Sequence, residues 1–163
     1  METKKVLYPG SFDPITKGHM NIIDKAVKFF GNVVVAVMQN NSKGEGMFTL
    51  FERAQMIRDI YKDNPHVTVI YEYSKKATVD VALENDCVGI IRGLRNVTDY
   101  EQEVQMSRIN KVISNGKVET LMLVADIEVQ DISSSLVKEL FYLNKDISKF
   151  VHPIVLTKMY LIK

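Results

Sequence analysis

The chain has 163 residues, of which 46% are hydrophobic and 25% charged, and its formal net charge is +1. This composition is typical of a soluble globular protein with one domain, residues 1–163, and it argues against a broad basic surface for nucleic acid. No apolar run approaches the roughly 20 residues of a membrane-spanning helix, and the first five residues lack the apolar stretch of a signal peptide. A single cysteine, Cys87, excludes an internal disulfide and fits a reducing compartment. We therefore expect a cytoplasmic protein without nucleic-acid or membrane partners.

Strand-like and helix-like patterns alternate along the chain. Short apolar runs predict strands at residues 5–9, 33–38, 67–72, 88–91 and 119–124. Helical spacing predicts helices near residues 17–30, 50–62, 77–86 and 99–114, then after the serines at 133–135 and after residues 152–153. Repeated strand–helix units predict a Rossmann-like α/β fold, in which helices flank a doubly wound sheet of five parallel strands.

Polar residues mark the expected helix starts. Thr16 and a serine of the run at 133–135 are candidate N-caps. Thr49 and Thr98 are each followed three residues later by glutamate, which is the spacing of a capping box. We therefore expect helices to begin at Thr49 and Thr98.

The most informative segment runs from Tyr8 to His19 and reads Tyr-Pro-Gly-Ser-Phe-Asp-Pro-Ile-Thr-Lys-Gly-His. It joins the first expected strand to the first expected helix, where unpaired N–H groups and the positive end of the helix dipole favour an anion. Gly18 would let a ligand approach the backbone closely, and His19 would face the anion from the first helical turn. The spacing T-x-G-H resembles the signature of nucleotidyltransferases, which place a histidine against the α-phosphate of a nucleotide.

Three further polar groups follow expected strands, where a doubly wound sheet binds its ligands. Arg92 and Arg95, with glycine between them, could hold an extended polyphosphate or could belong to a solvated loop. Lys43 lies in a polar loop with two glycines and could close over a phosphate, although a plain exposed loop fits equally well. The serines at 133–135 could form a second anion site or only a helix cap.

Acidic residues open the helix after the arginines. Asp99 and Glu101 suit a first helical turn, and Glu101 would complete the capping box of Thr98. Glu103 lies one turn further and could instead face a ribose or base. The sequence contains no phosphate loop, no dinucleotide-binding glycine motif and no histidine–cysteine cluster with zinc spacing, so we predict no metal-ligating residues.

Taken together, these motifs resemble the bacterial phosphopantetheine adenylyltransferase family over essentially the whole chain. The matching segments are residues 8–14 with the T-x-G-H element, 47–50 with Glu52 and Arg53, 91–95 before 99–101, and 132–139. The T-x-G-H element alone marks only the nucleotidyltransferase superfamily. The arginine and serine elements, in this order and spacing, point to the phosphopantetheine branch.

The resemblance implies reversible transfer of the adenylyl group of ATP to 4′-phosphopantetheine. The products are dephospho-coenzyme A, an intermediate of coenzyme A biosynthesis, and pyrophosphate. The attack would be direct and in line, without a covalent intermediate, in a Mg²⁺-dependent homohexamer.

Site residues can be carried over from the same resemblance. His19, Lys43 and Arg92 would be catalytic, and Ser11, Lys43, Thr78 and Arg92 would hold phosphopantetheine. The implied ATP site comprises Ser11, Phe12, His19, Gly93, Leu94, Arg95, Glu103, Val129, Gln130, Asp131, Ile132, Ser133, Ser134 and Ser135.

Two other functions stay open at this point. A sister nucleotidyltransferase would act on nicotinate mononucleotide, or on glycerol 3-phosphate with CTP, and would share His19 and the serine run. A nucleotide sensor on the same fold would bind ATP without turnover, since fold does not fix function. Arg92, Arg95 and Lys43 favour the phosphopantetheine enzyme, because they suit an acceptor with a terminal phosphate.

Overall fold

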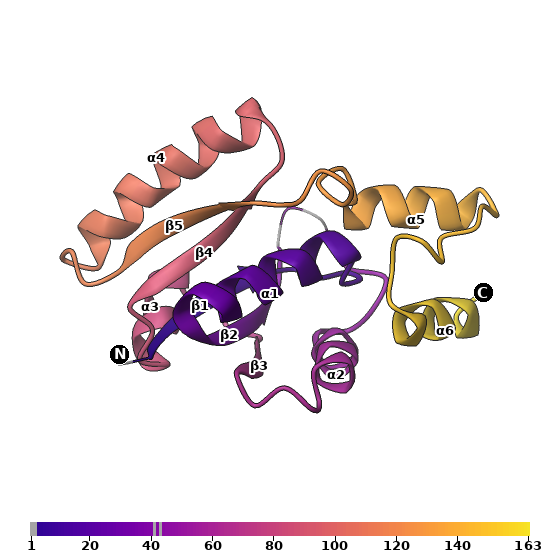
Figure 1. Ribbon diagram of the computed structural model, residues 1–163, viewed down its shortest axis with the longest axis horizontal. Helices are drawn as coiled ribbons and strands as arrows, with labels where there is room; N and C mark the ends of the chain where they lie inside the picture. The colour runs from indigo at the N-terminus through magenta and orange to yellow at the C-terminus, as the bar shows by residue number, and fades with distance from the viewer. Residues whose placement is uncertain (1–2, 41, 43) are drawn as a thin grey trace.

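A computed structural model describes residues 3–40, 42 and 44–163 (Figure 1). Within these residues five parallel strands form one sheet in the order β3-β2-β1-β4-β5. The strands are β1 (Lys4–Gly10), β2 (Gly31–Met38), β3 (Val67–Glu72), β4 (Gly89–Leu94) and β5 (Glu119–Val124). The helices are α1 (Lys17–Phe30), α2 (Leu50–Ile60), α3 (Thr78–Glu84), α4 (Val97–Ile113), α5 (Ser134–Tyr142) and α6 (Pro153–Leu161). The Rossmann-like α/β prediction is confirmed.

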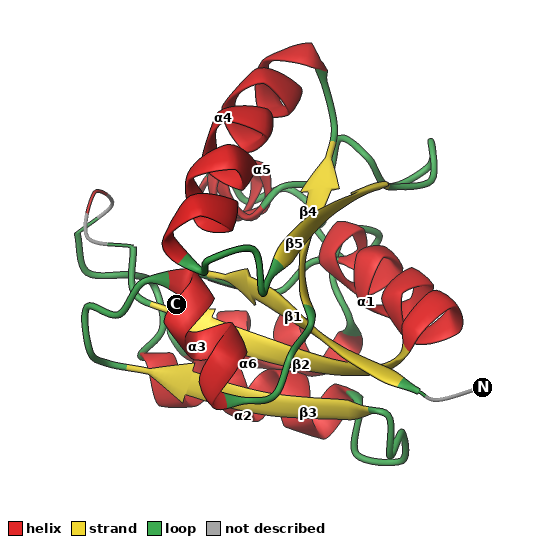
Figure 2. Cartoon of the chain, turned by 90° about the vertical axis from the view of Figure 1, so that its left-hand side faces the viewer, coloured by secondary structure: helices red, strands yellow, loops and turns green. Residues whose placement is uncertain are grey.

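Helices cover both faces of the sheet and create two apolar layers. Because successive side chains of a strand point to opposite faces, neighbouring residues of β1 enter different layers. Val6 packs with Ile23 of α1 and Ile57 of α2 on one face, whereas Leu7 packs with Val81 of α3 on the other. Figure 2 shows α3 in front of the sheet and α2 behind it. The central strands β1 and β2 are therefore the most buried, as their continuous apolar runs predict.

Most predicted helix starts are confirmed, but the one at Thr98 is wrong. Thr16 and Thr49 both cap their helices through complete capping boxes, and Ser133 caps α5. Helix α4 instead begins at Val97, and its N-cap is Asn96, whose side chain accepts the N–H of Asp99 at 2.9 Å. Asparagine is among the best N-caps, so it takes this role two residues ahead of Thr98.

The fourth strand also differs from its prediction. It runs to Leu94 rather than ending at residue 91, so Arg92, Gly93 and Leu94 are its last residues and not part of a loop. Pairing with β5 continues through Leu94 and fixes Arg92 in a regular strand. This rigid setting positions the arginine better than a loop would.

Helices α5 and α6 lie on the side of the molecule opposite α4, past the sheet (Figure 1). His152, which carries no predicted catalytic role, caps α6 by accepting the N–H of Ile154 at 3.2 Å. No helix in the described part of the chain is both long and apolar enough to cross a membrane.

Candidate active site

A cavity of about 910 Å³ opens at the carboxyl ends of β1 and β4. This is where a doubly wound sheet binds ligands, beside the two strands at which the strand order reverses. Of the residues expected at the site, the cavity is lined by Ser11, Phe12, His19, Thr78, Arg92, Gly93, Leu94, Arg95, Glu103, Val129, Gln130, Ile132, Ser133, Ser134 and Ser135. Asp131 is exposed and does not line the cavity. Lys43 lies outside the described residues.

His19 is fixed by the start of its own helix. The backbone N–H of Thr16 donates to Nδ1 of His19 at 3.1 Å, and the His19 N–H donates to the Thr16 hydroxyl at 3.4 Å. The ring of Phe12 packs edge-on against the imidazole, with 5.1 Å between centroids. Because Nδ1 accepts a hydrogen bond, the proton of the neutral ring resides on Nε2. The imidazole therefore offers Nε2–H as a hydrogen-bond donor.

Burial keeps this imidazole neutral. Desolvation, and secondly the positive charge of Arg95, lower the pKa of His19 to about 4. At neutral pH the side chain is therefore a neutral donor rather than a cation. A group of this kind suits a phosphoryl oxygen on which charge builds up during reaction.

Gly18 serves the packing of the chain itself. A Cβ at this position would lie 2.8 Å from the carbonyl oxygen of Ile132 and 3.0 Å from that of Val129. The backbone of residues 129–132 therefore fills the space where a side chain would lie, while Gly18 itself also lines the cavity. The missing side chain lets this segment lie against the start of α1, where the Thr16 hydroxyl donates to the Ile132 carbonyl at 3.3 Å.

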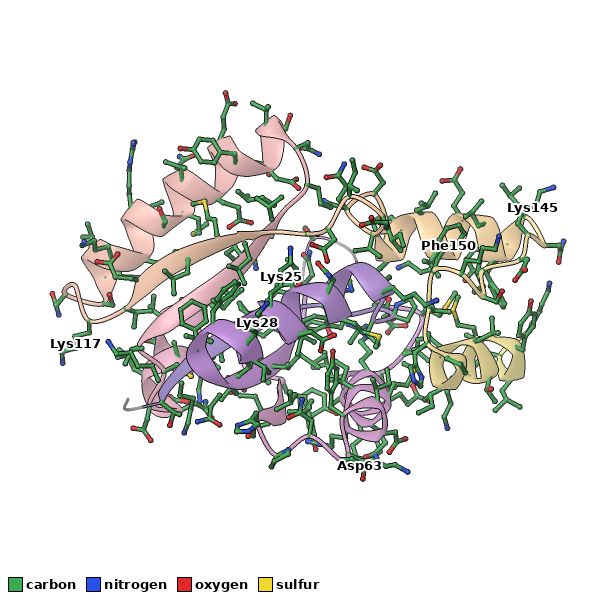
Figure 3. The ribbon with its side chains drawn as sticks, viewed as in Figure 1. Lys25, Lys28, Asp63, Lys117, Lys145 and Phe150 are labelled. Carbon is green, nitrogen blue, oxygen red and sulfur yellow. The ribbon has the colours of Figure 1, made fainter. Side chains whose placement is uncertain are left out.

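Two further contacts hold α1 in place beside the cavity. Lys25 Nζ lies 2.6 Å from the Val124 carbonyl oxygen and 2.7 Å from Asp126 Oδ1, which ties α1 to the end of β5 (Figure 3). At the other end of the helix, the Lys17 N–H donates to the carbonyl of Phe150 at 2.9 Å. The first contact fixes the segment after β5 against α1, and the second fixes the segment between α5 and α6.

Both arginines of the site carry a carboxylate partner. Nε of Arg92 lies 3.0 and 2.9 Å from the two carboxylate oxygens of Glu103, and Nη2 lies 2.8 Å from Oε1. Arg95 contacts Asp99 through Nε at 3.0 Å and Nη2 at 3.5 Å. Glu103 was expected at the ATP site, and in this structure it contacts the arginine assigned to phosphopantetheine.

The serine run has structural partners as well as a place in the cavity. The Ser133 hydroxyl accepts the Leu136 N–H at 3.1 Å, and the Ser134 hydroxyl donates to the Pro14 carbonyl at 2.7 Å. The first bond caps α5, and the second attaches the start of α5 to the loop after β1. The helix start therefore presents its N-terminal N–H groups to the same cavity as His19.

Comparison with known proteins identifies the family. A sequence model of the cytidylyltransferase-like family matches residues 7–140. A phosphopantetheine adenylyltransferase of Finegoldia magna is 48% identical over 93% of this chain and 91% of its own length. Proteins of the same name from Geobacter sulfurreducens and Geobacter metallireducens are 42% and 40% identical, each over 95% of this chain and 92% and 93% of their own lengths. The chain belongs to the phosphopantetheine adenylyltransferase family. It is accordingly a nucleotidyltransferase.

The cavity of this chain is also lined by residues to which the sequence analysis assigned no role. Lys76 follows β3 and lines the cavity, where its ammonium lies 2.8 Å from Glu84 and 3.4 Å from Glu72. The position of Lys76 shortly after the carboxyl end of β3 is a signal that could have indicated it as a site residue. Tyr8, which begins the Tyr8–His19 segment but was given no role, also lines the cavity, and burial raises its pKa, so the phenol stays protonated.

The sequence analysis also gave no role to a buried carboxylate in the loop after β1, Asp13, which links parts of the site. Asp13 accepts the N–H groups of Met47 and Phe48 at 2.8 and 2.9 Å, and lies 3.3 Å from Arg53 and 3.4 Å from Lys138. Arg53 in turn donates to the Phe48 carbonyl at 2.7 Å and to the Ser11 carbonyl at 3.2 Å. This Asp13 cluster joins the loop after β1 to α2 and α5. In the sequence, Asp13, Arg53 and Lys138 lie in three separate segments, so their contact could not be predicted from local patterns.

The acidic side chains that line the cavity contact arginine. Among the described residues there is no group of three or more His, Cys, Asp or Glu side chains that could hold a metal ion. The two carboxylates that line the cavity, Asp99 and Glu103, both pair with arginine. A Mg²⁺ ion here would therefore take most of its oxygen ligands from nucleotide phosphates and water.

Proposed function

We propose that this chain reversibly transfers the adenylyl group of ATP to 4′-phosphopantetheine, giving dephospho-coenzyme A and pyrophosphate. The reaction belongs to coenzyme A biosynthesis. The observation that carries the proposal is the convergence of His19, Arg92, Arg95 and the start of α5 on one cavity, in a chain of this family.

The chemistry requires alignment more than proton transfer. The attacking group is a phosphate monoester whose second pKa is about 6, so it is largely dianionic at neutral pH and needs no general base. One of its oxygens attacks the α-phosphorus of ATP while the bond from that phosphorus to the bridging oxygen breaks. Pyrophosphate leaves with the electron pair, and no covalent enzyme intermediate forms.

Repulsion between two anions is the main barrier, and several groups of the cavity suit its reduction. Arg92 and Lys43 would neutralise and aim the acceptor phosphate, while Thr78 would line its site. Nε2–H of His19 would donate to the α-phosphoryl oxygen on which charge accumulates. Mg²⁺, bound with the nucleotide, would neutralise phosphate charge.

The remaining site residues are assigned to ATP. Ser11 and the end of β4 would contact the phosphates together with Arg95 and the N–H groups at the start of α5. Val129, Gln130 and Ile132 would line the nucleotide site, with Phe12 beside His19, and Asp131 would contact the nucleotide from outside the cavity. Support comes from their common cavity, in which the part of the chain between β5 and α5 lies against α1.

We also propose a homohexamer in the cytoplasm, with no nucleic-acid or membrane partner. Helix α4 and the end of β5 leave several apolar side chains exposed, namely Val97, Met106, Val112, Val124 and Ile127. Exposed apolar surface of this kind favours contact between subunits. Light scattering should give the mass of six chains of 18.6 kDa, and the mass of one chain would contradict the assembly.

An acceptor panel tests the reaction. The protein is incubated with ATP and Mg²⁺ together with 4′-phosphopantetheine, nicotinate mononucleotide or glycerol 3-phosphate, and adenylylated products are identified by mass spectrometry. A parallel reaction contains CTP and glycerol 3-phosphate. We expect dephospho-coenzyme A as the only nucleotidyl product. A product from another acceptor alone would assign the chain to a sister activity, and ATP binding without any product would indicate a nucleotide sensor.

A further inference from the structure

Tyr8 carries a buried hydroxyl that the described residues leave without a hydrogen-bond partner. The residue belongs to β1 and is only 6% exposed, yet it lines the cavity. Within residues 3–40, 42 and 44–163, the only fully enclosed polar side-chain atom that lacks a partner is Oγ1 of Thr120. The unpartnered hydroxyl of Tyr8 is therefore not enclosed in the core, and it reaches the cavity.

A buried phenol normally has a hydrogen-bond partner. Burial of a hydroxyl without one is unfavourable, and most buried tyrosines find one. Tyr61, a second buried tyrosine of the same apolar layer, donates to Asp24 at 3.1 Å. Phenylalanine would fill the space of the Tyr8 ring without this cost. The hydroxyl of Tyr8 therefore indicates a ligand that supplies the missing acceptor oxygen.

The neighbours of this hydroxyl belong to the part of the cavity that is assigned to ATP. The oxygen lies 3.8 Å from the position that a Cβ on Gly93 would take. The Tyr8 ring packs edge-on against Phe12, with 5.3 Å between centroids, and Phe12 packs edge-on against His19. His19 is the donor assigned to the α-phosphoryl group. One aromatic side chain thus connects Tyr8 to that donor.

The charges around Tyr8 favour an anionic partner. Burial raises the pKa of the phenol, although the positive charges of Arg92 and Arg95 oppose this shift. The phenol is therefore protonated at neutral pH and can donate its O–H. The same two arginines attract negative charge to this part of the cavity. A phosphate oxygen meets both conditions, since it is negatively charged and accepts hydrogen bonds.

We propose that the Tyr8 hydroxyl donates a hydrogen bond to a phosphoryl oxygen of bound ATP. Tyr8 is then a further ligand of the nucleotide, in addition to His19 and Arg95. This inference rests on the proposed function, because it assigns one more group to ATP in that reaction. The phenol adds a directed donor to the site without adding a charge.

Tyr8→Phe tests the hydroxyl alone, because it keeps the ring that packs against Phe12. A hydrogen bond to a charged group is stronger than one between neutral groups. We therefore expect the affinity for ATP and kcat/KM for ATP to fall by about 10- to 100-fold, with little change in the KM for 4′-phosphopantetheine. The melting temperature of the free protein should stay the same or rise, since the described residues offer the hydroxyl no partner.

Tyr61→Phe is the matched control, because the Tyr61 hydroxyl has a partner in the fold. Tyr61 donates to Asp24 and is not among the residues that line the cavity. Its variant should lose about 2–6 °C in melting temperature and keep wild-type kinetics. Unchanged affinity and kcat/KM for ATP in Tyr8→Phe would overturn the proposal. A fall in melting temperature equal to that of the control would also overturn it, because the hydroxyl would then stabilise the fold.

Deoxynucleotides distinguish a phosphoryl oxygen from a ribose hydroxyl as the partner of Tyr8. ATP, 2′-deoxyATP and 3′-deoxyATP are titrated into the wild type and Tyr8→Phe by calorimetry, without 4′-phosphopantetheine. A contact to a phosphoryl oxygen predicts the same ratio of wild-type to variant affinity for all three nucleotides. A ratio near one with either deoxynucleotide would assign the contact to the ribose and overturn the proposal. A wild type that binds ATP but forms no dephospho-coenzyme A refutes the proposed function, whereas these ratios still test Tyr8.

Discussion

Asp13 provides the sharpest test of how the fold holds the candidate site together. The residue is only 5% exposed, and its carboxylate accepts two backbone N–H groups, from Met47 and Phe48. Two cations, Arg53 and Lys138, lie within 3.4 Å of it. The perturbation is Asp13→Asn, which preserves the shape of the side chain but removes its charge and one acceptor.

The expected cost follows from these contacts. Asparagine can still accept one of the two N–H groups, but its NH₂ group faces the other donor. A buried donor without a partner costs about 1–3 kcal/mol. Arg53 is only 4% exposed, so it would become a buried charge without its carboxylate. Loss of one partner from a buried ion pair costs about 3–5 kcal/mol, and we take this range as the total change in the free energy of unfolding.

Calorimetry measures the effect. For a protein of this size, 1 kcal/mol corresponds to roughly 2–4 °C in melting temperature, so Asp13→Asn should lower Tm by about 6–20 °C. The matched control is Asp126→Asn, which removes a carboxylate that also contacts a lysine and an asparagine but has a 55% exposed side chain. We expect a much smaller change in Tm for the control. Equal, small changes for both variants would refute the role of Asp13 as a buried anchor.

Further predictions concern the catalytic groups and the packing beside them. His19→Ala should lower kcat by about 10²–10³-fold with little change in ATP binding, as when one transition-state hydrogen bond is removed, and equal losses in kinetics and in calorimetric affinity would contradict this. Because the pKa of His19 is lowered to about 4, the unfolded chain binds a proton between pH 6.5 and 4 that the folded chain does not. As the pH falls from 6.5 to 4, the free energy of unfolding of the wild type, measured with urea, should therefore decrease by up to about 3 kcal/mol more than that of His19→Gln. Equal decreases in the two proteins would refute the lowered pKa. Arg92→Ala should raise the KM for 4′-phosphopantetheine, and an unchanged KM would remove Arg92 from the acceptor site. Gly18→Ala should cost about 1–3 kcal/mol and weaken ATP binding, because its Cβ would displace residues 129–132, so wild-type affinity in calorimetry would count against this packing.

Local sequence patterns predicted much of the fold because its elements are locally determined. The apolar runs of β1 and β2, the N-cap at Thr16 and the capping box at Thr49 need no distant information. The predicted start of α4 was wrong because two candidate N-caps, Asn96 and Thr98, lie close together. The structure selects Asn96, since β4 continues to Leu94 and the chain turns into the helix within two residues.

The candidate site was predicted less completely, because its contacts join distant parts of the chain. The sequence indicated Arg92 as a phosphate ligand, but not that Glu103, eleven residues later, would grip it from α4. Asp13 and Lys138 are 125 residues apart and meet only when α5 packs against the loop after β1. Gly18 was noted, but its neighbour proved to be the chain's own backbone.

Pyrophosphate release tests the central claim most directly. The protein is assayed with ATP and Mg²⁺ in the presence of 4′-phosphopantetheine and, in parallel, of pantetheine that lacks the phosphate. The attack of an anionic phosphate, aimed by Arg92, predicts release only with the phosphorylated acceptor. Release with both acceptors would contradict the phosphate as nucleophile, and release with neither would contradict the proposed reaction itself.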